Sequence, residues 1–174
     1  MTATPPRPAW VEALAPPTPI DAAAAMELSL ALAAASSQQG DGPFGAVIVD
    51  PDGQVVGVGW NRVVASHDST AHAEIVALRD AQARAQDHTL PGHHLFSSCA
   101  PCIQCFGAIW WSGLAAVSWC AAQEDAAAAG FDEGPVTPTM WHELRARKGT
   151  HIHAAVGPVA RAAAQLRDYA GPHY

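Results

Sequence analysis

The chain has 174 residues, 49% of them hydrophobic, which is enough for one well-buried domain and too few for two of ordinary size. Nine lysines and arginines stand against sixteen acidic residues, a formal net charge of −7, and no basic run is long enough to follow a phosphate backbone. These values disfavour a nucleic-acid partner. No apolar run reaches membrane-spanning length.

The N-terminal segment, residues 1–19, is rich in proline and should form an extended or irregular arm ahead of a single domain over residues 20–174. The arm lacks the basic and apolar regions of a signal peptide. Asp21 can cap a long alanine-rich helix, which should end near Gly40.

The next segments predict a β-hairpin followed by a helix. Residues 44–50 and 55–60 are mostly apolar runs, and Pro51-Asp52-Gly53 between them is turn chemistry. Residues 61–69 form a polar loop. A helix should begin around Thr70 or Ala71, because apolar residues then recur at helical spacing.

Downstream, a short strand over residues 95–98 leads to a helix that starts at Pro101 and ends near Ser112, and residues 114–121 predict another strand. Strands that alternate with helices of these lengths indicate a parallel or mixed sheet covered on both faces, with a pocket where strands end and helices begin. The remaining predicted elements are helices at 124–129, 139–147 and 159–169 and an edge strand at 151–156.

Two short motifs offer metal-ligating side chains. Cys102 and Cys105 are three residues apart, which puts both on one face of a helix, and Pro101 suits the first position of that helix. A helix N-terminus favours thiolate over thiol. Adding His72 gives one nitrogen and two sulfur ligands, a set that suits Zn²⁺ and leaves one tetrahedral position open, as in catalytic sites. Three cysteines crowded into one segment favour metal binding in a reducing cytoplasm over disulfides.

Glu74 is the predicted catalytic base. It lies with His72 in the first helical turn, but side chains two residues apart diverge on a regular helix, so Glu74 should not be a second ligand on that face. It can still reach water at the open position. A carboxylate so placed can take a proton from that water and return it to a leaving amine, as the glutamate of H-x-E…P-C-x-x-C zinc deaminases does.

These motifs resemble those of the cytidine deaminase superfamily. The likeness extends over roughly residues 20–135, and within the superfamily the chain resembles bacterial guanine deaminases. The stretches that carry it are Gly42-Pro43-Phe44-Gly45-Ala46-Val47, Asn61, Thr70-Ala71-His72-Ala73-Glu74, Pro101-Cys102-Ile103-Gln104-Cys105 and Ala129-Gly130-Phe131-Asp132-Glu133. The resemblance implies a three-layer α/β/α sandwich with a central mixed five-stranded sheet. It also implies zinc-dependent hydrolysis of guanine to xanthine and ammonia.

The resemblance further implies how a small nucleobase would be bound. Phe44 and Trp111 would wall the planar base, and Asn61 and the backbone of Ala73 would hydrogen-bond its polar edge. Trp111 has a second interpretation: adjacent Trp110 faces another side of the helix, and one of the two is expected in the core.

Glu133 would be a second acid near the leaving amine, although aspartate stands there in some relatives. Guanine deaminases of this type are dimers whose C-terminal segment can cross to the partner. A homodimer is therefore expected, with Tyr174, or else Tyr169, closing the pocket.

Several alternatives stay open. The three ligands can belong to a closed structural zinc site, with Cys99, His67, His93 or His94 as the fourth. Glu133 can be a solvated loop acid. The substrate can be guanosine, cytidine, cytosine or an amino-triazine. A tRNA adenosine deaminase shares both zinc motifs but should display a basic face. Finally, zinc can stabilise a non-catalytic binding protein, which would not require Glu74.

Overall fold

The computed structural model describes residues 6–14, 18–132 and 134–173. None of the helices in these ranges is long and apolar enough to cross a membrane. In chain order the elements are α1 (Ala9–Leu14), α2 (Ala22–Gln38), β1 (Gly45–Val49), β2 (Val55–Trp60), α3 (Val63–Ser66), α4 (Ala73–Ala85), β3 (His94–Cys99), α5 (Ile103–Ser112), β4 (Ala116–Ala121), α6 (Gln123–Ala128), α7 (Pro138–Lys148), β5 (His151–His153) and α8 (Val159–Arg167).

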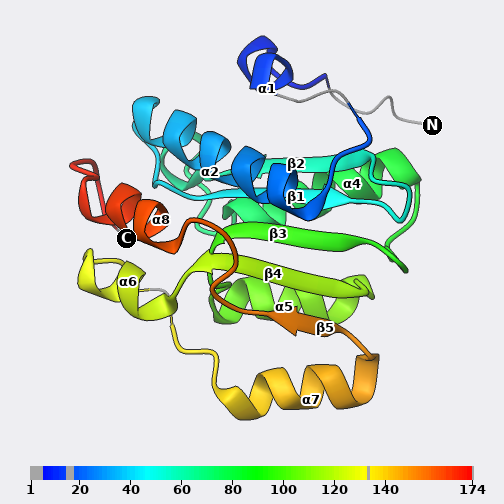
Figure 1. The fold of residues 1–174 in the computed structure, drawn as a ribbon. Coiled ribbons are helices and arrows are strands. Elements are labelled where there is room, and N and C mark those ends of the chain that lie inside the picture. Colours follow the sequence, from blue (N-terminus) through cyan, green and yellow to red (C-terminus); the bar gives the residue numbers. More distant parts are fainter. Residues whose placement is uncertain (1–5, 15–17, 133, 174) are drawn as a thin grey trace.

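The strands form one mixed sheet in the order β2-β1-β3-β4-β5. Strand β1 is antiparallel to both β2 and β3, whereas β3, β4 and β5 run parallel. Helices α2 and α8 cover one face of the sheet, and α4 and α5 cover the other (Figure 1). Val47 and Ile48 point to opposite faces of β1 and are both fully buried, because both faces are covered. The predicted three-layer sandwich with five strands is confirmed.

Two glycines of β2 let α4 approach the sheet closely. A Cβ atom at Gly57 would lie 2.6 Å from the carbonyl oxygen of Ala77, and one at Gly59 would overlap the carbonyl group of Ala73. Any side chain at either position would push the helix outward. The N-terminus of α4 is therefore held directly over the end of β2.

The predicted helix that Asp21 caps and that ends near Gly40 is confirmed as α2, and the predicted hairpin is confirmed as well. Asp21 is the N-cap of α2, and its Oδ1 atom accepts a hydrogen bond from the backbone nitrogen of Ala24 at 2.8 Å. Strands β1 and β2 pair antiparallel around the predicted turn. The polar loop predicted over residues 61–69 is partly wrong, because Val63–Ser66 form the short helix α3.

The N-terminal arm is also more ordered than predicted, since it contains α1. Val11 on this helix is 1% exposed, and the ring of Trp10 meets that of Trp60 edge-on at 4.9 Å. Arg7 forms an ion pair with Asp80 of α4 at 2.8 Å. These tertiary contacts override the irregular tendency of the flanking prolines.

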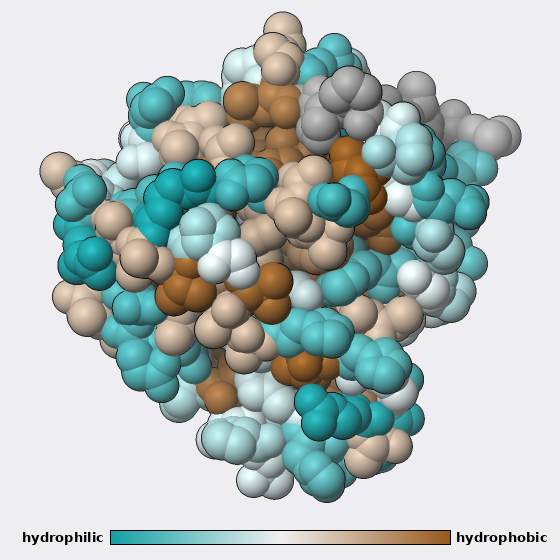
Figure 2. Space-filling model, viewed as in Figure 1, coloured by the Kyte–Doolittle hydropathy of each residue, from teal (hydrophilic) through white to brown (hydrophobic). Residues whose placement is uncertain are grey.

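Helix α7 lies beyond β5 at the edge of the sheet (Figure 1). It buries Leu144, and most of its other side chains are exposed. The surface over this end of the molecule is accordingly mostly hydrophilic (Figure 2). Helix α7 thus adds only a thin layer beyond the edge strand β5.

Candidate metal centre and active site

Strand pairing brings separate parts of the chain to one edge of the sheet. Gly45 at the start of β1 lies opposite Trp60 at the end of β2, and Ala46 lies opposite Ser97 near the end of β3. The residues just outside these ends are therefore neighbours. The backbone nitrogen of Asn61 donates to the carbonyl oxygen of Phe44 at 3.1 Å.

His72 and Cys102 are the N-cap residues of α4 and α5. Both helices begin later than predicted. The expectation that these two residues lie in first helical turns is therefore wrong. Both backbones are extended, and neither side chain makes a capping hydrogen bond. The two side chains can therefore turn away from their helices toward each other. The Sγ atom of Cys102 lies 3.5 Å from the Nδ1 atom of His72.

Cys105, in the first turn of α5, completes the group. One ligand atom from each of His72, Cys102 and Cys105 lies within 4.8 Å of the other two. Cys105 is fully buried and Cys102 is 2% exposed. The three predicted ligands are thus brought together where two helix N-termini, each with partial positive charge, converge.

The electrostatics of the cluster favour a thiolate. The hydrogen bond from Cys105, helped by one from His72, lowers the pKa of the Cys102 thiol to about 4, although burial alone would raise it. The hydrogen bond with Cys102 and burial raise the pKa of Cys105. One buried negative charge shared by two sulfurs is the arrangement that a cation stabilises.

The donor set fits zinc. One imidazole nitrogen and two cysteine sulfurs match catalytic zinc sites, in which three protein ligands leave the fourth tetrahedral position for water or substrate. No fourth histidine, cysteine or carboxylate joins the group within residues 6–14, 18–132 and 134–173. In particular, the Sγ atom of Cys99 lies 3.5 Å from the carbonyl oxygen of Ala122 instead. A closed structural site built on these residues is not supported.

Glu74 lies beside the ligands but outside the group, as predicted. Its side chain is 6% exposed, and burial raises the pKa of its carboxyl group. The Oε1 atom accepts a hydrogen bond from the hydroxyl of Ser97 at 3.1 Å, and the Oε2 atom lies 3.4 Å from the Sγ atom of Cys105. A proton acceptor is thus fixed next to the metal ligands.

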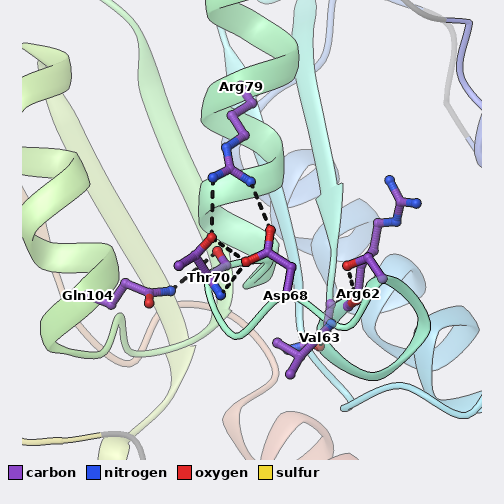
Figure 3. Close-up of polar contacts among 8 residues, drawn as sticks. Arg62, Val63, Asp68, Thr70, Arg79 and Gln104 are labelled. Carbon is purple, nitrogen blue, oxygen red and sulfur yellow. Dashed lines mark hydrogen bonds and ion pairs between the residues drawn. The ribbon is translucent and has the colours of Figure 1, made fainter.

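The loop ahead of His72 is tied to both helices of the site (Figure 3). Gln104 of α5 donates to the carbonyl oxygen of Thr70 at 3.3 Å. Asp68 accepts from the backbone nitrogen and the hydroxyl of Thr70 at 2.8 and 2.6 Å, and it pairs with Arg79 of α4 at 3.7 Å. These contacts hold the segment that carries His72 against the N-terminal end of α5, where both cysteines lie.

Three of the predicted base-binding residues lie at this edge of the sheet. Phe44 is 7% exposed, Asn61 is 1% exposed, and Ala73 is the first residue of α4. The Oδ1 atom of Asn61 accepts a hydrogen bond from the backbone nitrogen of Val63 at 3.0 Å. That bond fixes the orientation of the amide group.

Trp111 does not lie with them within this chain, and its place as a wall of the base stays a prediction. It sits in the last turn of α5, nine residues beyond Cys102, which at 1.5 Å per residue is about 13 Å along the helix axis. Its side chain is 76% exposed, with the Nζ atom of Lys148 at 5.8 Å from the ring centre. The helix carries it away from the site.

Glu133 and Tyr174 lie outside the described residues. The segment leading to Glu133 nevertheless starts beside the site, because the ring of Phe131 meets that of Phe44 edge-on at 4.9 Å. On the far side of that segment, Gln123 accepts from the backbone nitrogen of Val136 at 3.3 Å.

Tyr169, the alternative lid residue, is packed inside the molecule. It is 7% exposed, its ring stacks on that of Phe131 at 5.8 Å, and its hydroxyl donates to the carbonyl oxygen of Gly40 at 3.4 Å. His173 also contacts the ring of Phe131, at 4.7 Å. The C-terminal residues therefore extend the aromatic packing that starts at Phe44.

Sequence reasoning missed Ser97. The available signal was weak: Ser97 and Ser98 are two polar residues inside a short buried strand, where any unpaired hydroxyl would carry a desolvation cost. Their partners lie far away in the sequence, so no local pattern identifies them.

Comparison with known proteins agrees with this geometry. Residues 20–121 match the family model described as the cytidine and deoxycytidylate deaminase zinc-binding region. Guanine deaminase of Bacillus subtilis (strain 168) is 48% identical over 92 residues, which cover 53% of this chain and 58% of that protein. A tRNA-specific adenosine deaminase of Buchnera aphidicola subsp. Schizaphis graminum (strain Sg) is 39% identical over 84 residues, which cover 48% of this chain and 55% of that protein.

The chain thus spans somewhat more than half the length of these two curated relatives. Among solved structures, guanine deaminase from Nitrosomonas europaea superimposes with a TM-score of 0.85 at 34% identity, covering 97% of this chain and 96% of that one.

Proposed function

Because the chain belongs to the cytidine and deoxycytidylate deaminase family, we propose that it is a zinc-dependent aminohydrolase that converts guanine to xanthine and ammonia. The observation that carries the proposal is the convergence of His72, Cys102 and Cys105 beside the buried carboxylate of Glu74. A non-catalytic zinc site would not require that carboxylate.

The residues have distinct roles in this reaction. Zinc held by the three ligands would supply an activated water molecule. Glu74 accepts a proton from the attacking water and delivers protons to a ring nitrogen and to the leaving amine. Its burial suits this shuttle, because a raised pKa keeps the protonated form accessible after the proton is taken up. Glu133 is proposed as the second acid on the amine side.

Base recognition is assigned to the strand ends. The ring of Phe44 offers a flat apolar surface, and the backbone of Ala73 lies in the first turn of α4, where N–H groups lack helical partners. Because the Oδ1 atom of Asn61 is engaged by Val63, we assign the amide N–H groups of Asn61 to the acceptors of the base. Tyr174 is retained as the proposed closing residue.

Guanine is favoured by two relatives, at 48% and 34% identity. A tRNA adenosine substrate is the second candidate, favoured by the 39% identity to a tRNA-specific adenosine deaminase. The net charge of −7 argues against it, since tRNA binding depends on neutralising phosphates.

Ammonia release tests the proposal. Purified, zinc-loaded protein is offered guanine, guanosine, cytosine, cytidine, adenine, an amino-triazine and a tRNA anticodon stem-loop separately, with the Glu74→Ala protein as the blank. Guanine should be the preferred substrate. Preference for a nucleoside, a triazine or the stem-loop would overturn the substrate, and no release from any of them would overturn the activity.

We also propose a cytoplasmic homodimer. The four cysteines form no disulfide within the described ranges, which fits a reducing compartment.

Ile103 and Trp111 are 46% and 76% exposed along α5, and an apolar helix face of this kind suits a second copy. His173 already contacts Phe131 of its own chain, so exchange of C-terminal segments is not required for that contact. Light scattering after size exclusion should give twice the chain mass.

A further inference from the structure

We propose that Ser97 is a positioning residue that holds the Glu74 carboxylate in the orientation needed for proton transfer. The inference deepens the proposed function and rests on it. Ser97 belongs to no motif of the site and is not one of the three residues grouped as metal ligands. Its role follows from which carboxylate oxygen it contacts.

Ser97 is itself immobilised by the sheet. It lies on the central strand β3, opposite Ala46 of β1 and Trp119 of β4, and is 2% exposed. Its backbone therefore has hydrogen-bonded neighbours on both sides. A hydroxyl on such a support is a fixed reference point, in contrast to one on a loop.

The hydrogen bond crosses from the sheet to a helix. The hydroxyl of Ser97 donates to the Oε1 atom of Glu74 at 3.1 Å, and both residues are buried. Hydrogen bonds to a charged acceptor are about twice as strong as neutral ones, and this bond is shielded from competing water. It fixes the side-chain torsions of a residue that otherwise has three rotatable bonds.

The two oxygens of Glu74 then have different tasks. Oε2 lies 3.4 Å from the Sγ atom of Cys105, on the side of the metal ligands. A cysteine that ligates a metal is a thiolate and has no proton to donate. With Cys105 serving as a ligand, its sulfur would donate no hydrogen bond to Oε2, whereas the Ser97 hydroxyl would remain a donor to Oε1. Oε1 is thus the oxygen anchored by Ser97, and Oε2 is the oxygen that faces the metal ligands.

The neighbouring serine has a different partner, which makes the assignment specific. Successive side chains on a strand point to opposite faces. The Oγ atom of Ser98 accepts a hydrogen bond from the backbone nitrogen of Gly45 at 3.0 Å and so joins β3 to the start of β1. Ser97 alone of this pair faces α4 and Glu74.

Steady-state kinetics with guanine test the role. Ser97→Ala should lower kcat by about 10- to 100-fold, the size expected for a hydrogen bond to a charged group, and leave KM unchanged because Ser97 does not touch the base. Ser97→Thr, which keeps the hydroxyl, should restore kcat to within about threefold. Ser112→Ala, which removes another buried serine hydroxyl at the distant end of α5, is the matched control and should leave both constants unchanged.

Coupling between the two residues separates positioning from a structural effect. In a Glu74→Asp background, whose shorter carboxylate no longer matches the Ser97 hydroxyl, Ser97→Ala should cause a smaller fold-loss of turnover than in the wild type, and bound zinc per chain should stay at the wild-type level in every variant. A loss of turnover as large as that in the wild-type background, or a loss of zinc with Ser97→Ala, would overturn the inference.

A readout without activity keeps the inference distinguishable from the proposed function. In chelator-treated protein, Ser97→Ala and Glu74→Gln should shift the urea midpoint by less in combination than the sum of their separate shifts. Additive shifts would refute the contact. If wild-type protein released no ammonia from any substrate while the midpoints were coupled, the function would fail and the Ser97–Glu74 contact would stand.

Discussion

Residues 20–121 and residues 122–173 reach the site by different physical means. In the first segment, strand register and two helix starts bring His72 and Cys102 together, so main-chain geometry sets their positions. In the second, Phe131 reaches the same edge through ring contacts with Phe44 and Tyr169. Main-chain geometry thus sets the proposed catalytic group, whereas the side proposed to face the substrate depends on side-chain packing. Changes in the second segment should alter binding before they alter catalysis.

The largest effect is expected when a proposed metal ligand in the first segment is removed. Cys102→Ser should reduce turnover to the level of the Glu74→Ala blank, because a serine hydroxyl does not replace a thiolate ligand of zinc. Metal analysis should show zinc lost from the protein. Cys120→Ser, the same exchange at a buried thiol outside the ligand group, should retain both zinc and turnover.

The second prediction concerns a packed aromatic ring in residues 122–173. Phe131 is 2% exposed, so Phe131→Ala should cost about 3 kcal/mol of unfolding free energy and raise KM, while zinc content is unchanged. Urea unfolding and steady-state kinetics measure these effects. His142→Ala, which removes an exposed ring on α7, should change the unfolding free energy by less than about 0.5 kcal/mol and leave KM unaltered. An equally raised KM for that control would show that the effect is not specific to Phe131.

The third prediction concerns two neighbouring histidines, one from each of the two segments. Burial, with the charge of neighbouring His153, lowers the pKa of His94 to about 4. In the unfolded chain this imidazole takes up a proton near pH 6.5, so the unfolded state binds more protons between the two values. His94 therefore contributes stability that is complete above about pH 6.5 and is lost as the pH falls toward 4.

Solvent screening at this partly exposed ring limits the loss to about 2 kcal/mol or less. Urea unfolding at pH 7 and pH 5 should show a smaller drop in stability for His94→Gln than for the wild type. Equal drops in the two proteins would contradict the assignment to His94.

The smallest effect is expected at the N-terminal arm. Arg7 donates to the Oδ2 atom of Asp80 through two nitrogens, at 3.0 and 2.8 Å, and Arg7→Ala should cost about 1 kcal/mol of unfolding free energy. Arg84→Ala, at the more exposed partner of the same carboxylate, should cost less than about 0.5 kcal/mol. Reversal of that order would show that the arm does not depend on this ion pair.

The sequence by itself determined the local elements and the ligand types. Asp21 predicted the start of α2, α5 ends at Ser112 as predicted, and the spacing of Cys102 and Cys105 with His72 predicted the metal group. These signals lie within a few residues of the feature that they specify, so they can be read without the fold.

Tertiary structure decided what depended on distant partners. The ordered arm follows from contacts of Val11 and Trp10 with the core, and the separation of Trp111 from the site follows from the direction of α5. Ser97 acquires its role only because β3 faces Glu74 across the layers of the sandwich. A single buried serine has no sequence signature, because the energy of its hydrogen bond is set by a partner that only folding brings within reach.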